Sequence, residues 1–172
     1  MKPLLRSLFV IAILITSLSA AAQKPTTALE LNNYFATIND TLYASGRKWG
    51  AELGNIYKNK DFSSLVPLRK KLELFIANKQ TQLKQMKDIG GSEEFRLAML
   101  DFLAFESKMI KEAFVTFEKL NSKSTDEEVK KTLDQLTELA KNEDAVLQKV
   151  NAAQLKFAEK NGFTIEAEEE GN

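Results

Sequence analysis

The sequence contains no cysteine and no histidine in its 172 residues. Without them the chain cannot form disulfides, Ser-His-Asp or Cys-His catalytic machinery, histidine-ligated haem, Glu-x-x-His di-iron centres or the usual zinc sites. The groups that remain for chemistry are carboxylates, lysines and tyrosines, which suit transition metals poorly. The sequence therefore predicts a protein that is not an enzyme and that uses no metal and no cofactor.

Proline and glycine are also scarce, with three and seven residues. A loop-rich all-β fold uses both at its turns, so their scarcity favours helices. Lys and Arg together number 24, as do Asp and Glu, and the two signs are interspersed along the chain. Because no basic stripe is present, the charge pattern does not indicate binding to nucleic acid.

Long apolar runs are absent except at the N-terminus. There Lys2 and Arg6 flank the run LFVIAILITSL, which is too short to span a bilayer, and Ala20 and Ala22 occupy the small-residue positions of a cleavage site. We therefore expect residues 1–22 to be a cleavable signal peptide. The protein would be exported to the periplasm, the cell surface or the medium, with no transmembrane anchor after cleavage. An uncleaved N-terminal anchor is the alternative.

Beyond the signal peptide, apolar residues recur every three or four positions, which is the period of an amphipathic helix. Short connections between helices make sequential neighbours antiparallel. We therefore expect residues 23–163 to form an all-α, antiparallel up-down-up-down four-helix bundle, and residues 164–172 to form an acidic, disordered tail. A spectrin-like three-helix arrangement is the alternative. The expected helical segments are residues 27–58, 64–89, 92–120 and 124–161.

Turn and capping residues mark the ends of these segments. Gly90 and Gly91 are expected to end the second segment, because glycine adopts the left-handed C-cap conformation freely. Ser124 with Glu127 fits a capping box at the start of the fourth segment. Gly162 is expected to end it.

The stretch GRKWGAELG places Gly46, Gly50 and Gly54 at every fourth position of the first segment, beside its apolar stripe. Each glycine costs a helix about 1 kcal/mol relative to alanine. The favoured interpretation is a seam where a neighbouring helix packs closely. The alternative is a shallow groove, walled by Tyr43 and Tyr57, that receives a partner or ligand.

Polar residues interrupt the apolar stripes at similar heights in the expected bundle. They are Lys79, Glu106 and Glu143, with Ser45 on the first segment. We expect Lys79 to pair with one of the two carboxylates, since such a partly buried pair fixes helix register. A functional site, with a bound cation or a carboxylate of raised pKa, is the alternative.

The third segment is apolar on its outer side as well, at Leu97, Leu100, Phe114 and Val115. An exposed patch of this kind meets either a partner or the chain's own residues 163–165.

The same segment is rich in aromatic and methionine side chains. A void among them would suit a small apolar ligand. The residues concerned are Phe102, Phe105, Met109 and Phe117.

The signal peptide, the four helical segments without cysteine or histidine, and the connection DIGGSEEF together resemble a family of uncharacterised bacterial envelope or surface proteins, expected to be helical bundles. The family has no established activity, so the resemblance implies a location and a fold only. The sequence therefore predicts an envelope interaction or scaffold module that binds an envelope protein. The alternative is a carrier of a small apolar ligand. The oligomeric state stays open.

Overall fold

The computed structural model describes residues 24–165. This part of the chain contains helices and turns and no strand. The expected signal peptide, and all but the first two residues of the expected acidic tail, lie outside the described residues. The elements are α1 (Ala28–Ile56), η1 (Phe62–Ser64), α2 (Leu65–Lys84), α3 (Glu93–Met109), η2 (Ile110–Phe114), α4 (Val115–Phe117), α5 (Asp126–Ala140) and α6 (Glu143–Asn161).

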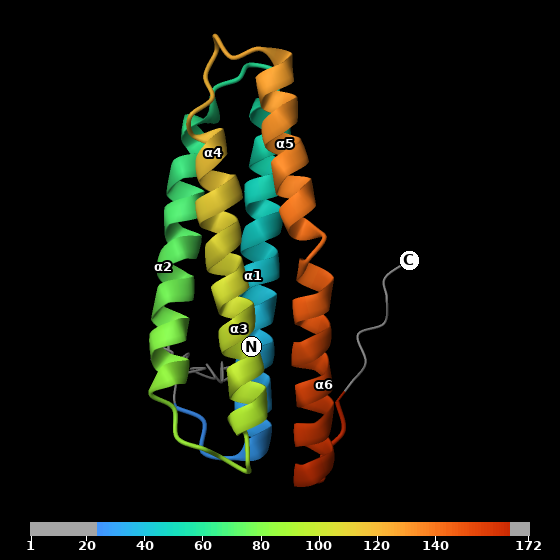
Figure 1. Ribbon diagram of the computed structural model, residues 1–172. Helices are drawn as coiled ribbons and strands as arrows, with labels where there is room; N and C mark the ends of the chain where they lie inside the picture. The colour runs from blue at the N-terminus through green and yellow to red at the C-terminus, as the bar shows by residue number, and fades with distance from the viewer. Residues whose placement is uncertain (1–23, 166–172) are drawn as a thin grey trace, which may run out of the picture.

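These elements build four helical rods within the described residues, namely α1, α2, the run α3–η2–α4, and the pair α5 and α6. Figure 1 shows the rods side by side, and the colour gradient shows that each rod runs opposite to the one before it. The rods α1 and α3 both contact α2 and α6. The all-α prediction with four helical segments is thus confirmed for residues 24–165.

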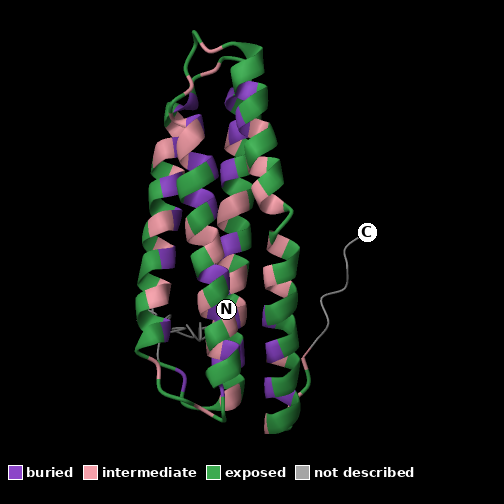
Figure 2. Cartoon of the chain, viewed as in Figure 1, coloured by how far each residue is buried: buried purple, intermediate pink, exposed green. Residues whose placement is uncertain are grey.

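The core lies along the inward faces of the rods, as the buried positions in Figure 2 show. Aromatic rings form much of it. The Phe35 ring meets the Phe95 ring edge-on at 4.8 Å, and Phe95 lies 5.7 Å from Phe157. Edge-on ring pairs stabilise a core beyond the apolar area that they bury, so this ladder joins α1, α3 and α6 in the lower half.

The first helix begins where the sequence predicts, with Thr27 as its N-cap. The Glu30 N–H donates to Thr27 Oγ1 and the Thr27 N–H donates to Glu30 Oε2, each at 3.2 Å. This reciprocal pair is a capping box, which satisfies two backbone donors that the helix leaves without partners.

The capping box of the fourth segment lies one residue later than expected. Thr125 and Glu128 form it, and not Ser124 and Glu127. The reason is that Ser124 Oγ already accepts the Asn121 N–H, at 3.1 Å, in the turn before the helix.

The second helix ends at Lys84, before the glycine pair that was expected to end it. Gly90 and Gly91 instead shape the loop to α3, with φ of 65° and 77°. A Cβ on Gly90 would lie 2.4 Å from Asn161 Oδ1, so the loop approaches the end of α6 closely. Gly162, with φ of 71°, ends α6 as predicted.

Two irregularities were not expected. The fourth segment is not continuous, because it breaks between α5 and α6 at Lys141 and Asn142. The Asn142 side chain donates to the Glu138 carbonyl at 3.4 Å, which satisfies one of the orphan carbonyls at the end of α5. The second irregularity is η2, a π-helical turn inside the third rod.

Candidate functional site

Glu106 and Glu143 form the most perturbed pair of titratable groups in the described chain. Glu106 lies near the end of α3, and Glu143 is the first residue of α6, directly after the break. Burial, followed by the negative charge of Glu143, raises the pKa of Glu106 to about 7. Burial also raises the pKa of Glu143, with a smaller effect from Asp144. The negative charge of Glu143 on α6 thus acts on the carboxyl group of Glu106 on α3.

The rest of that layer differs from the prediction. The Ser45 side chain is half-buried and makes no hydrogen bond with the described residues. Residues 24–165 contain no group of three or more acidic side chains placed to hold a metal ion. What the layer provides is a carboxyl group, that of Glu106, whose pKa is raised to about 7.

The predicted pairing of Lys79 with Glu106 or Glu143 is wrong. Lys79 makes no ion pair with any described residue. Its Nζ donates to Tyr34 Oη at 3.1 Å, and it lies 4.6 Å from the Tyr34 ring and 5.5 Å from the Phe75 ring. An oxygen acceptor and two aromatic faces hold the ammonium on the α1–α2 side of the molecule.

The glycine row of α1 is not a packing seam. A Cβ placed on Gly46, Gly50 or Gly54 would meet no atom within 4 Å. Tyr43 is 68 % exposed and Tyr57 is 41 % exposed. The row therefore faces open space within the described structure.

The expected outer patch of the third rod is correct in part. Leu97 is exposed, whereas Leu100 and Val115 are half-buried. Phe114 is buried, and its ring stacks on Trp49 with 3.9 Å between centroids and 9° between planes. Phe114 shares its helix face with Leu103, which is fully buried, because eleven residues bring a helix back to within about 20° of the same direction. Phe163, which was expected to cover this patch, packs edge-on against Phe157 of α6.

The aromatic and methionine cluster of the third rod belongs to the packed core. Phe102, Met109 and Phe117 are buried, and Phe105 is half-buried against them. Such close packing does not favour a carrier site at this position.

A buried ion cluster was missed by the sequence analysis. Arg69 of α2 donates through Nε and Nη2 to the two oxygens of Glu118, and through Nη1 to Glu73 at 2.7 Å. The hydrogen bond that Arg69 donates to Glu118 is the main cause of the raised Arg69 pKa. The sequence indicates this cluster only weakly. Arg69 lies beside the apolar stripe of α2, which is a position that solvent-exposed arginines commonly occupy.

A groove beside the N-terminal arm was also missed. It has a volume of about 650 Å³ and lies between residues 24–26, α1, the end of α2 and the loop to α3. The sequence does not reveal this groove, because its lining residues come from four segments that lie together only in the folded chain. The lining residues are Lys24, Pro25, Thr26, Tyr34, Gln82, Gln85, Met86, Lys87, Asp88 and Ile89.

Comparison of the chain with known protein families, with curated proteins and with solved structures gives no match. The resemblance to bacterial envelope proteins therefore stays a prediction. Among residues 24–165, none of the helices combines the length and the hydropathy needed to cross a membrane.

Proposed function

We propose that the protein is an exported, non-enzymatic interaction module that docks through α1, and that its partner is a second copy of the chain. We define the docking row as Tyr43, Gly46, Gly50, Gly54 and Tyr57. The open space in front of the three glycines is the observation that carries this proposal.

The glycines of the row have no role in the packing of the described chain. None of the three has a positive φ, so alanine would fit the backbone at each position. Together they cost α1 about 3 kcal/mol relative to alanine. Glycines on an open helix face allow a second helix to approach closely, and exposed tyrosines are favourable anchors at interfaces.

The spacing of the row supports a second copy as the partner. Gly46 and Gly54 stand four residues on either side of Gly50, and Tyr43 and Tyr57 stand seven residues on either side. When two α1 helices cross in antiparallel orientation at Gly50, each residue of the row meets its counterpart. A surface of this kind is self-complementary, as a two-fold symmetric interface requires.

Charge supports the same arrangement. Asp40 of α1 and Lys58, in the turn just after α1, are exposed and lie ten and eight residues from Gly50 on opposite sides of it along the chain. In the antiparallel pair, Asp40 of each copy lies close to Lys58 of the other copy. Opposite charges at the rim favour this register over the parallel one.

The oligomeric state tests the proposal. We expect light scattering coupled to size-exclusion chromatography to show a concentration-dependent dimer. Gly50→Leu should raise the dimer dissociation constant at least tenfold without lowering the melting temperature. Ala51→Leu is the matched control, because Ala51 is the next exposed position, about 100° around the helix. A wild-type chain that stays monomeric at high concentration, or equal effects of both variants, would contradict the proposal.

Export depends on residues 1–22 and is tested separately. We expect the protein recovered from producing cells to begin at Gln23, as measured by intact mass. A membrane-bound species that retains Met1 would refute the signal peptide.

A further inference from the structure

The groove beside the N-terminal arm has the size of a small-molecule site. Its volume of about 650 Å³ lies within the range of roughly 300–1,000 Å³ typical of ligand pockets. Side chains from the arm, α1, α2 and the following loop converge on it. Nothing in the docking row on the upper part of α1 contributes to it.

The inner wall of the groove combines an apolar surface with side-chain amides that can donate hydrogen bonds. Pro25, Met86 and Ile89 supply the apolar surface. The Tyr34 hydroxyl donates to Gln82 Oε1 at 2.6 Å. Because that oxygen is occupied, the Gln82 side chain has its NH₂ group left to offer a ligand, and Gln85 adds a second amide.

The charges at the rim favour an anion. Lys24 and Lys87 line the groove, and neither makes an ion pair with a described residue. The two carboxylates nearby keep their charge but are held by hydrogen bonds within the chain. Asp88 Oδ1 accepts the Ser92 hydroxyl at 3.1 Å, and Glu30 accepts hydrogen bonds from the backbone and hydroxyl of the arm.

We propose that this groove binds a small amphipathic organic anion, namely a carboxylate with a compact apolar tail. The carboxylate lies between Lys24, Lys87 and the glutamine amides. The tail covers Met86 and Ile89. In the lining, Lys24 and Lys87 outnumber the carboxylate of Asp88, and this excess of positive charge and the apolar wall are complementary to such a ligand.

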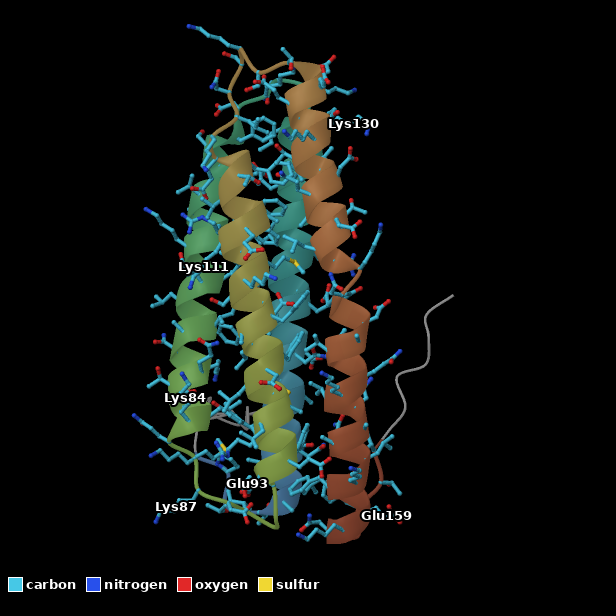
Figure 3. The ribbon with its side chains drawn as sticks, in the orientation of Figure 1. Lys84, Lys87, Glu93, Lys111, Lys130 and Glu159 are labelled. Atoms are coloured by element: carbon cyan, nitrogen blue, oxygen red, sulfur yellow. The ribbon has the colours of Figure 1, made fainter. Side chains whose placement is uncertain are left out.

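Calorimetric titration of the full chain with octanoate tests the proposal, with octanamide as the neutral probe of equal length. We expect one saturable octanoate site and at least tenfold weaker binding of octanamide. Lys87→Glu should weaken octanoate binding at least tenfold. Lys84→Glu is the matched control, because Lys84 lies three residues before Lys87, in the last turn of α2, and does not line the groove. Figure 3 shows Lys84 near the lower end of α2 and Lys87 below it, in the loop to α3.

Lys84→Glu should change octanoate affinity less than twofold, since it alters the net charge equally but at the wrong place. Equal losses in both variants would show a non-specific charge effect and overturn the proposal. Unchanged binding in Lys87→Glu, or equal binding of octanamide, would overturn it as well. Gly50→Leu should bind octanoate like the wild type, so this result does not depend on the proposed dimer.

Discussion

Replacing Glu106 by glutamine should stabilise the protein at alkaline pH and remove much of its pH dependence. Glu106 is half-buried, and the negative charge of Glu143 acts on it. Glutamine has nearly the same shape, cannot ionise, and so keeps the packing while removing the charge. The substitution thus isolates the electrostatic contribution of one group.

The expected magnitude follows from the pKa of Glu106, which rises from an ordinary 4.5 to about 7 on folding. Both the folded and the unfolded chain carry the proton below about pH 4.5. As the pH rises towards 7, the unfolded chain releases the proton while the folded chain retains it, so the free energy of unfolding falls. Above pH 7 the loss is complete and reaches at most about 3 kcal/mol.

Urea unfolding followed by Trp49 fluorescence at pH 4.5 and pH 8 measures this effect. Trp49 is the single tryptophan and is 2 % exposed, so its emission reports loss of the core. Glu106→Gln should gain up to about 3 kcal/mol at pH 8 and less than about 0.5 kcal/mol at pH 4.5. Some slope should remain, because the pKa of Glu143 is raised by burial as well.

Asp101→Asn is the matched control, since Asp101 is an exposed carboxylate on the same helix. It should leave the unfolding free energy within about 0.5 kcal/mol at both pH values. If Glu106→Gln destabilises the protein at pH 8, then the carboxylate has a favourable partner and the reasoning from burial and repulsion is wrong.

Three further substitutions test other parts of the structure by the same urea unfolding. Arg69→Met should cost about 3 kcal/mol because it leaves Glu118 buried without a partner, and replacing Glu118 by leucine as well should recover most of the loss. Gly90→Ala should cost about 1–3 kcal/mol, because alanine adopts a φ of 65° only with strain and its Cβ would meet Asn161. Deleting the exposed Lys111 should convert η2 into α-helix and change stability by no more than about 1 kcal/mol. A loss beyond about 3 kcal/mol in the deletion variant would show that the π turn is required by its surroundings.

The apolar period of the sequence predicts the four rods because every core residue contributes to it. The same signal cannot show the break between α5 and α6. Leu136, Ala140 and Leu147 continue one stripe across Lys141 and Asn142. Tertiary packing and the side chain of Asn142 determine where the helix breaks. The spacing of the apolar residues indicates neither of them.

The pairing of the polar side chains was harder to predict than their positions along the helices. Glu106 and Glu143 do interact, but Lys79, at the expected height on α2, reaches Tyr34 instead. A lysine side chain is long and flexible, and a phenol oxygen with two aromatic faces competes with a carboxylate at little desolvation cost. A single sequence predicts the position of such a residue along a helix. It does not predict which neighbouring side chain the charged end will contact.

The burial of Phe114 escapes prediction because the face that it shares with Leu103 was not recognised as a core face. In a regular helix Phe114 lies about 20° from Leu103, which is fully buried, and in the π turn η2 its ring stacks on Trp49. The Thr116 hydroxyl donates to the Ala113 carbonyl beside the turn, which compensates part of the disturbed backbone bonding.

Trp49 Nε1 is buried and finds no acceptor within residues 24–165, which costs about 1–3 kcal/mol. Burial of an aromatic ring and its stacking contribute about 2–4 kcal/mol. Packing therefore outweighs the lost hydrogen bond here, and the balance depends on two residues 65 positions apart that no local window contains.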